Sequence, residues 1–320
     1  MKKTITIIMT SLALATAVFA QEAAISFENT ISSDVISVSE GDNEFAGITE
    51  QITAEFESEK LDAGISLITE FNKNEDNHFG LTAYEIDKAY VEFKPVDILG
   101  IAFNRKIFTA GSYLPIADDN VGNGNIGSDL SLILRPIENL SVAAGLKIPS
   151  VFADTEEKVD LDAGIDYTTD LFSVGATLRS PVNNLGFGVF GSYTGIDNLT
   201  LNLGFSYNDE FCDVAGNLLT LGAAYEVSIF TIGFDFVSNF GNDGNDLYTA
   251  LALEAGITDN IIVETQAALN MDFEDSKATQ VIAEVGGAYV IGDHKIRGGI
   301  AIDFSDSISF SFPVYYQYSF

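Results

Sequence analysis

The chain ends with ISFSFPVYYQYSF (residues 308–320), in which apolar or aromatic residues occupy every second position. Ile308, Phe310, Phe312 and Val314 alternate with residues that are mostly small or polar. Successive side chains of a β-strand point to opposite faces, so this spacing gives one apolar face and one polar face. In a helix of 3.6 residues per turn the same residues would spread around the axis. The segment therefore predicts a strand whose two faces meet different environments.

The same alternation recurs along the rest of the chain. It is most regular in residues 61–67, 159–167, 199–207, 230–236 and 296–304. Less regular strands are predicted near residues 25–38, 46–57, 82–93, 98–109, 128–134, 140–148, 171–179, 186–194, 218–225, 247–256, 261–271 and 279–291. The pattern predicts about 18 strands, with 16 as an alternative count, and most approach the ~10 residues that a tilted strand needs to cross a bilayer.

The N-terminus has the features of an export signal. A basic start at Lys2 and Lys3 precedes a mostly apolar run, and Val18-Phe19-Ala20 places small residues three and one before a cleavage point. The apolar run is shorter than the ~20 residues of a membrane-spanning helix. We therefore predict a signal peptide over residues 1–20 and a single domain over residues 21–320.

Connections between the predicted strands alternate in length. Short turns are predicted at residues 58–60, 94–97, 135–139, 168–170, 195–198, 226–228, 257–260 and 292–294. Mostly longer loops, acidic or rich in Gly and Asn, are predicted at residues 39–45, 72–80, 110–127, 149–158, 180–185, 208–217, 238–246 and 272–278. Short turns on one rim and longer loops on the other are typical of an outer-membrane barrel. The predicted fold class is therefore all-β, a transmembrane antiparallel up-and-down β-barrel.

A secreted soluble β-protein is the competing interpretation, because the strands of a β-sandwich also alternate. In this chain nearly every predicted strand has an apolar face, and the other face is mostly Ser, Thr, Asn, Asp, Glu and Gly. A polar lumen with lipid outside explains this pattern, and closure into a barrel removes the unpaired strand edges that lipid does not tolerate. We therefore favour the membrane barrel.

The composition excludes several classes of function. The chain has 47 Asp and Glu against 15 Lys and Arg, a net charge of −32, which does not suit contacts with nucleic-acid phosphates. One Cys and two His offer little for thiol, metal or acid–base chemistry. Asp160, Asp162 and Asp166 form an acidic row on one strand face but have no acid–base partner in the sequence. We therefore predict no enzyme activity, no catalytic residues, no cofactor and no dedicated metal site.

The end of the chain carries a family resemblance. Tyr316, Tyr318 and the terminal Phe320 resemble the C-terminal signal by which Gram-negative outer-membrane barrels are recognised for insertion, and the whole chain looks like a barrel of the porin kind. The resemblance implies a cell outer-membrane location, contact with outer-membrane lipid and recognition by the barrel-assembly machinery, and it leaves a homo-trimer open. It also implies that the loop 110–127 folds into the barrel and narrows the pore. The chain departs from the family in having no Trp, so an interfacial girdle must consist of Tyr and Phe.

Within the narrowing loop, Asp118, Asp119 and Asn120 are candidates to line a constriction. A divalent cation at these acidic loops is left open. A solvated surface loop is the alternative interpretation of the same residues.

The polar phase of the strands supplies candidates to line a pore. The acidic candidates are Glu55, Glu57, Asp62, Glu70, Asp160, Asp162, Asp166, Asp235, Glu254, Glu264, Glu284 and Asp303, and the basic ones are Arg179, Lys295, Arg297 and, less clearly, Lys88. Acidic rings favour cations over anions. The sequence thus predicts a channel for passive diffusion of small hydrophilic solutes that prefers cations. The alternative is a structural or adhesive surface protein without an open pore.

Overall fold

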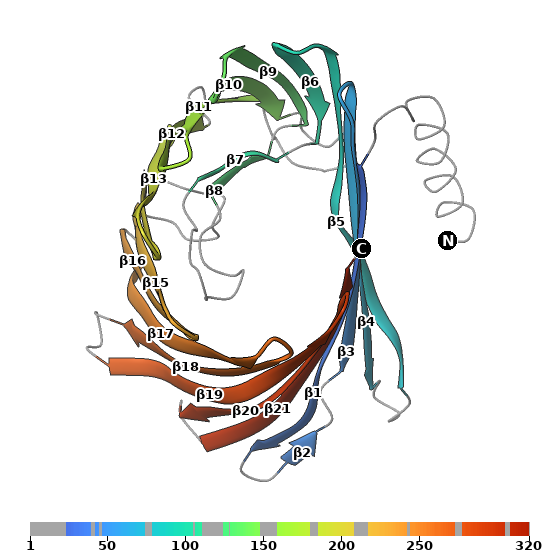
Figure 1. Cartoon of the computed structure of the whole chain (residues 1–320), viewed down its shortest axis with the longest axis vertical. Helices are drawn as coiled ribbons and strands as arrows, with labels where there is room; N and C mark the ends of the chain where they lie inside the picture. Colours follow the sequence, from blue (N-terminus) through green and yellow to red (C-terminus); the bar gives the residue numbers. More distant parts are fainter. Residues whose placement is uncertain are drawn as a thin grey trace.

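The protein is described here by a computed structural model. The described residues are 24–39, 42–44, 47–73, 79–104, 106–110, 124–127, 129–147, 159–179, 185–207, 217–241, 244–272, 277–304 and 308–319. Their strands form an antiparallel sheet that closes into a barrel of 18 strands, seen as a ring in Figure 1. Within these residues no helix is long and apolar enough to cross a membrane. The predicted signal peptide, residues 1–20, lies outside the described residues and stays a prediction.

The strands of the barrel wall follow one another around the ring in chain order. They are β1 (Ala24–Ser39), β3 (Ile48–Glu57), β4 (Leu61–Lys73), β5 (Phe79–Val96), β6 (Leu99–Phe103), β9 (Leu130–Ile137), β10 (Leu140–Lys147), β11 (Asp160–Thr168), β12 (Phe172–Arg179), β13 (Gly186–Ile196), β14 (Leu199–Tyr207), β15 (Asn217–Val227), β16 (Phe230–Gly241), β17 (Gly244–Thr258), β18 (Ile261–Asp272), β19 (Lys277–Ile291), β20 (His294–Phe304) and β21 (Ile308–Ser319). Three short strands complete the set: β2 (Asp42–Glu44), β7 (Lys106–Ala110) and β8 (Gly124–Gly127).

The first and last strands close the ring. β1 pairs with β21 from Glu28 opposite Ser319 to Val38 opposite Phe310, with one register shift along the way. On its other side β1 pairs with β3 over Ala24–Ser33, and the short β2 pairs with the far end of β1. Closure satisfies the backbone donors and acceptors that the two terminal strands would otherwise leave unpaired, which lipid requires.

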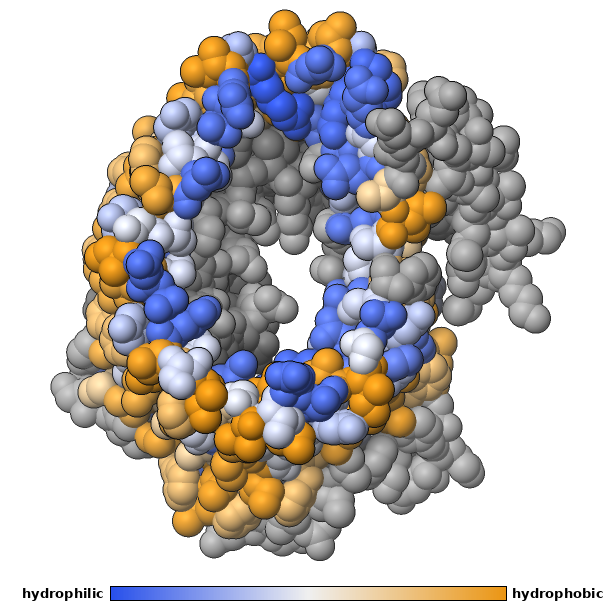
Figure 2. Space-filling model, viewed as in Figure 1, coloured by the Kyte–Doolittle hydropathy of each residue, from blue (hydrophilic) through white to orange (hydrophobic). Residues whose placement is uncertain are grey.

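The two faces of the wall differ as the alternation predicts. In β21 the outward residues Ile308, Phe310, Phe312 and Val314 are all exposed, although they are large and apolar. Figure 2 shows the same division around the ring, with hydrophobic residues on the outside and hydrophilic ones toward the centre. So much exposed apolar surface does not suit a soluble protein. A barrel whose outer face meets lipid accommodates it.

All eight predicted short turns lie on one rim of the barrel, together with the start of β1 and the end of β21. Several contain a residue in the left-handed backbone region, such as Asn139 (φ 68°), Asn198 (φ 63°) and Gly292 (φ 56°). Asn and Gly tolerate this conformation better than other residues, so the turn positions are encoded locally. The connections on the other rim lie largely outside the described residues.

Two predicted elements differ in the structure. The single strand predicted at 98–109 is divided, because β6 ends at Phe103 and β7 pairs with β8 in a separate two-stranded sheet. The loop predicted at 238–246 is much shorter, because β16 and β17 continue their pairing as far as Gly241 opposite Gly244. In the second case cross-strand pairing extends the ladder beyond the apolar pattern, with Asn239 opposite Asp246 and Phe240 opposite Asn245.

Candidate solute pathway

The polar residues of each alternating strand lie on the inner face of the wall. β11 illustrates the rule, because Leu161 and Ile165 point outward and are exposed. Asp160, Asp162 and Asp166 alternate with these residues and therefore point into the ring. Neighbouring strands continue the inner face through cross-strand pairs, such as Asp162 opposite Gly145 of β10.

The structure places ten of the predicted pore-lining residues on wall strands in the inward phase. They are Glu55 on β3, Asp62 on β4, Asp160, Asp162 and Asp166 on β11, Arg179 on β12, Asp235 on β16, Glu264 on β18, Glu284 on β19 and Arg297 on β20. The side chain of Arg179 lies outside the described part of the structure. This register does not test whether these residues meet a solute, so their role stays a prediction.

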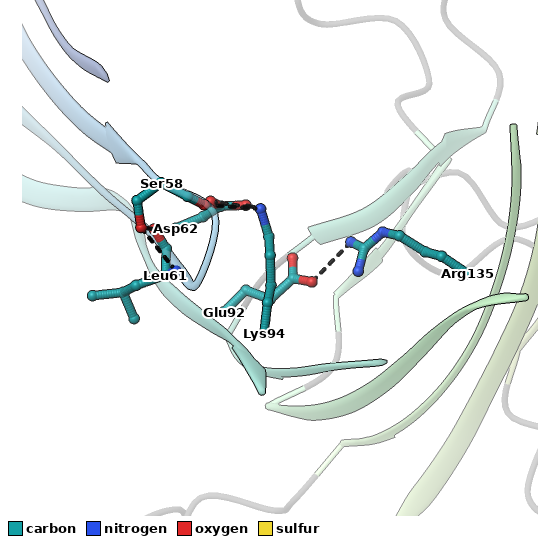
Figure 3. Close-up of polar contacts among 6 residues, drawn as sticks. All are labelled: Ser58, Leu61, Asp62, Glu92, Lys94 and Arg135. Atoms are coloured by element: carbon teal, nitrogen blue, oxygen red, sulfur yellow. Dashed lines mark hydrogen bonds and ion pairs between the residues drawn. The ribbon is translucent and has the colours of Figure 1, made fainter. Parts of the chain in front are cut away.

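The first polar cluster lies on the inner face of β4 to β9, close to the short-turn rim (Figure 3). Lys94 Nζ contacts both carboxylate oxygens of Asp62, at 2.6 and 2.8 Å, and lies 3.5 Å from the carbonyl oxygen of Ser58. The Asp62 side chain is only 6% exposed, so its charge depends on this partner. The contact ties β5 to the turn between β3 and β4.

A second pair crosses a whole strand. Arg135 Nη2 on β9 donates to Glu92 Oε1 on β5 over 2.8 Å, and the Glu92 side chain is completely buried (Figure 3). β6 lies between these two strands and contributes Gly100 beneath the ion pair. A Cβ atom at Gly100 would lie 2.1 Å from Glu92 Oε1 and 3.1 Å from Arg135 Nη1. Glycine at this position therefore makes room for the pair.

Arg297 organises the third polar cluster, on β17 to β21. Its Nε donates to Glu264 and its Nη2 donates to Glu284 over 2.9 Å. Gln266 donates to the other oxygen of Glu284 over 2.8 Å, and Lys295 Nζ lies 3.7 Å from Glu264. These residues border a cavity of about 470 Å³ in the inner wall, which is also lined by Glu254 and Tyr315. The Arg297 guanidinium is thus held by carboxylates of β18 and β19.

The hairpin of β7 and β8 lies inside the ring (Figure 1). Its register pairs Lys106 with Gly127 and Ala110 with Gly124. β7 comes within 8 Å, between Cα atoms, of β11, β12 and β13, and β8 comes within the same distance of β11. The two ends of the predicted narrowing loop therefore enter the barrel. The constriction candidates Asp118, Asp119 and Asn120 lie outside the described residues, so their role stays a prediction.

The predicted insertion signal lies on the outer face at the short-turn rim. His294 stacks on the Tyr318 ring at a centroid distance of 4.7 Å, and its Nδ1 lies 2.8 Å from the Tyr316 hydroxyl. Phe320 lies outside the described residues. On the same rim Tyr167 lies against Phe172 with ring centroids 6.1 Å apart. Aromatic residues of this kind form the interfacial girdles of membrane barrels.

Sequence reasoning missed Lys94, Glu92 and Arg135. Lys94 and Arg135 fall in the predicted short turns 94–97 and 135–139, but β5 extends to Val96 and β9 extends to Ile137. The proximity of Lys94 to Asp62 follows from the hairpin register, in which Asp62 lies opposite Glu92. The link between Glu92 and Arg135 has no local signal, because it spans 43 positions in the chain.

Among the described residues, no group of three or more His, Cys, Asp and Glu side chains is arranged to hold a metal ion. The acidic loops where a divalent cation was left open lie largely outside those residues. A cation at these loops therefore stays a prediction.

Comparisons with known proteins identify the fold. Neither a family model nor a curated protein matches the sequence. Among solved structures, OccK9 (OpdG) of Pseudomonas aeruginosa is similar over 94% of this chain and 99% of its own, with 11% identity and a TM-score of 0.62. OprB of Pseudomonas putida is similar over 95% of both chains, with 11% identity and a TM-score of 0.57. A mutant of the Rh. blastica porin covers 93% of this chain and 100% of its own, with 12% identity and a TM-score of 0.55. The chain thus has the fold of these porin-like β-barrels.

Proposed function

We propose that this chain, a porin-like barrel of the outer membrane, is a channel through which small hydrophilic solutes diffuse passively, with a preference for cations. The observation that carries the proposal is the closed 18-strand wall with an apolar outside and a polar inside. Barrels of about 16–18 strands are wide enough to hold an aqueous channel. Figure 2 shows hydrophilic residues on the inside of the ring around a central opening.

The charge on the inner face supports the cation preference. In the described residues the inward basic side chains Lys94, Arg135, Lys295 and Arg297 all form ion pairs with carboxylates. Such pairing leaves little net positive charge on the wall, while the chain as a whole carries a net charge of −32. A pore whose wall has an excess of carboxylates attracts cations and repels anions.

Conductance measurements test the proposal directly. We expect the mature chain, refolded in detergent and added to a planar bilayer, to give stepwise increases in current. In a potassium chloride gradient the reversal potential should have the sign of a cation-preferring pore. Protein denatured by boiling serves as the control for detergent leakage. An absence of steps, or a reversal potential of the opposite sign, would contradict the proposal.

Liposome swelling separates the channel from the alternative of a structural or adhesive surface protein. An open barrel should admit a small sugar and cause swelling, whereas a closed barrel should admit none. Chemical cross-linking of the same refolded protein would show whether it forms the homo-trimer that the family resemblance leaves open.

A further inference from the structure

Every short turn of the barrel carries an acidic residue in or beside it. Seven of the eight turns contain one, and Glu226, the next to last residue of β15, adjoins the eighth turn. All eight acidic residues are exposed. They are Glu59, Asp97, Glu138, Asp170, Asp197, Glu226, Asp259 and Asp293. Because the short turns surround one mouth of the barrel, these residues form a ring of negative charge around it, which we call the acidic ring.

Little positive charge offsets the acidic ring. Lys60 is the one Lys or Arg within the eight turns, and its Nζ lies 4.0 Å from Glu59 and 3.9 Å from Asp97. Two further bases near this rim, Lys94 and Arg135, are already paired with carboxylates on the inner wall. Among the residues that the structure describes, the other six members of the ring form no ion pair and no side-chain hydrogen bond. Their charges therefore face water without a partner.

The turns do not need these charges in order to fold. In the turns 138–139 and 197–198 the left-handed backbone conformation belongs to the neutral Asn139 and Asn198, at φ 68° and 63°. In the turn 292–293 it belongs to Gly292, at φ 56°. Three members of the ring are Glu, which is not among the residues that dominate β-turns. The recurrence of acidic residues therefore indicates a role for their charge at the mouth.

The spacing of the ring allows its charges to act together. Successive short turns are two strands apart, which corresponds to about 10 Å at the ~4.8 Å spacing of paired strands. The Debye length is about 10 Å at ~0.1 M salt, about 30 Å at ~0.01 M and about 3 Å at ~1 M. The fields of neighbouring carboxylates therefore overlap at low salt and are screened from one another at high salt.

We propose that the acidic ring attracts cations to the short-turn mouth and repels anions from it, so that the cation preference of the channel depends on the ring and rises as the salt concentration falls. In outer-membrane barrels the short turns face the periplasm, so the ring acts at the periplasmic mouth. The inference rests on the proposed channel function and assigns its selectivity to this mouth. The solutes favoured are small cations, inorganic or organic, because a field of this kind acts on net charge.

Reversal potentials in potassium chloride gradients test the assignment. The ring variant neutralises the six unpaired members, E138Q/D170N/D197N/E226Q/D259N/D293N, and the control E59Q/K60Q alters the same rim without a change of net charge. We expect the ring variant to lower the permeability ratio of potassium to chloride by about threefold or more near ~0.01 M salt and to match the unsubstituted channel near ~1 M. The control should match it at both concentrations. An unchanged ratio at low salt, or an equal fall at both concentrations, would overturn the assignment.

Thiol reactivity measures the field at the mouth without ion flow. In a Cys212→Ser background, S228C places a thiol in the turn between β15 and β16, flanked by the turns of Asp197 and Asp259. The refolded protein in detergent is reacted with a cationic and an anionic methanethiosulfonate reagent, and comparing the two reagents at one thiol cancels its accessibility. Relative to free cysteine, we expect the cationic reagent to be favoured about fivefold or more near ~0.01 M salt, and the preference to vanish near ~1 M.

The triple variant D197N/E226Q/D259N should bring the ratio of the two rates at position 228 close to that of free cysteine. An equal ratio with and without these three carboxylates would overturn the proposal even if the barrel conducts. A salt-dependent ratio in a barrel that gives no current would instead refute the channel function.

Discussion

The carboxylate of Glu92 on β5 and the guanidinium of Arg135 on β9 meet at 2.8 Å across the intervening strand β6. The Glu92 side chain is completely buried, whereas the Arg135 side chain is 32% exposed. The carboxylate is therefore shielded from solvent and the guanidinium only partly so. β6 has only five residues, and the chain leaves the wall after it to form the hairpin inside the ring. The ion pair therefore joins the two longer strands at the place where the wall is shortest.

Removing the arginine should destabilise the barrel. We expect R135M to lower the free energy of unfolding by about 3–5 kcal/mol, because a buried carboxylate loses its partner. Urea titration of the refolded protein in detergent, followed by tryptic resistance, measures the change. K60M is the matched control, since Lys60 lies about 4.0 Å from Glu59 on the surface and should contribute under ~1 kcal/mol. Equal losses in the two variants would show that the pair across β6 has no special role.

The glycine beneath the pair should not tolerate a side chain. We expect G100A to destabilise the barrel by about 1–3 kcal/mol, because the added Cβ would lie 2.1 Å from Glu92 Oε1 and displace the ion pair. G256A is the control, because a Cβ there would have its nearest neighbour, the Ile229 carbonyl oxygen, at 3.9 Å. Thermal unfolding on detergent gels, read from the heat-modified migration of the band, measures both. If G100A does not change the stability, a methyl group at position 100 does not displace the contact between Glu92 and Arg135, which would contradict the prediction.

The C-terminal aromatic residues should direct assembly. The alternation that places Tyr316 and Tyr318 on the outer face puts Phe320 at the next position of the same series. We expect F320S to insert more slowly into vesicles that contain purified barrel-assembly machinery, while spontaneous refolding in detergent stays unchanged. Q317S, on the inward phase of the same strand, is the control and should assemble at the normal rate. Equal assembly rates for F320S and the unsubstituted chain would contradict the resemblance on which the prediction rests.

The strand register could be predicted where the alternation is strict. Residues 199–207 and 308–319 appear as β14 and β21 with the expected outward phase, because a period of two fixes both conformation and face. The short turns were also predictable, since six of the eight contain Asn, Asp or Gly, as at Asn139 and Asn198. These features are local, and a single sequence contains them.

Other features depend on the closed ring and were not predictable. The division of residues 98–109 between β6 and β7 follows from where the chain leaves the wall, which no local pattern marks. The contrast between buried Asp235 and exposed Glu254 has no local signal, because both residues lie in the inward phase of their strands. The contact between Glu92 and Arg135 joins strands that are not direct neighbours. Periodicity indicates which residues point inward, but it does not indicate which of them meet water.

Two adjacent residues of β21 test the membrane orientation of the wall. Phe312 points outward and is 38% exposed, whereas Ser311 points inward and is half-buried opposite Ala301. We expect F312K to lower the free energy of unfolding in phospholipid vesicles by about 2–4 kcal/mol, because it places an ammonium group against the hydrocarbon near the middle of the strand. S311K adds the same charge toward the lumen and should fold with a much smaller loss. Urea titration of folding in vesicles, followed by tyrosine fluorescence and protease protection, measures both variants. If the two variants lost equal stability, lipid would not distinguish the faces of this strand, and the soluble β-protein would again be the better interpretation.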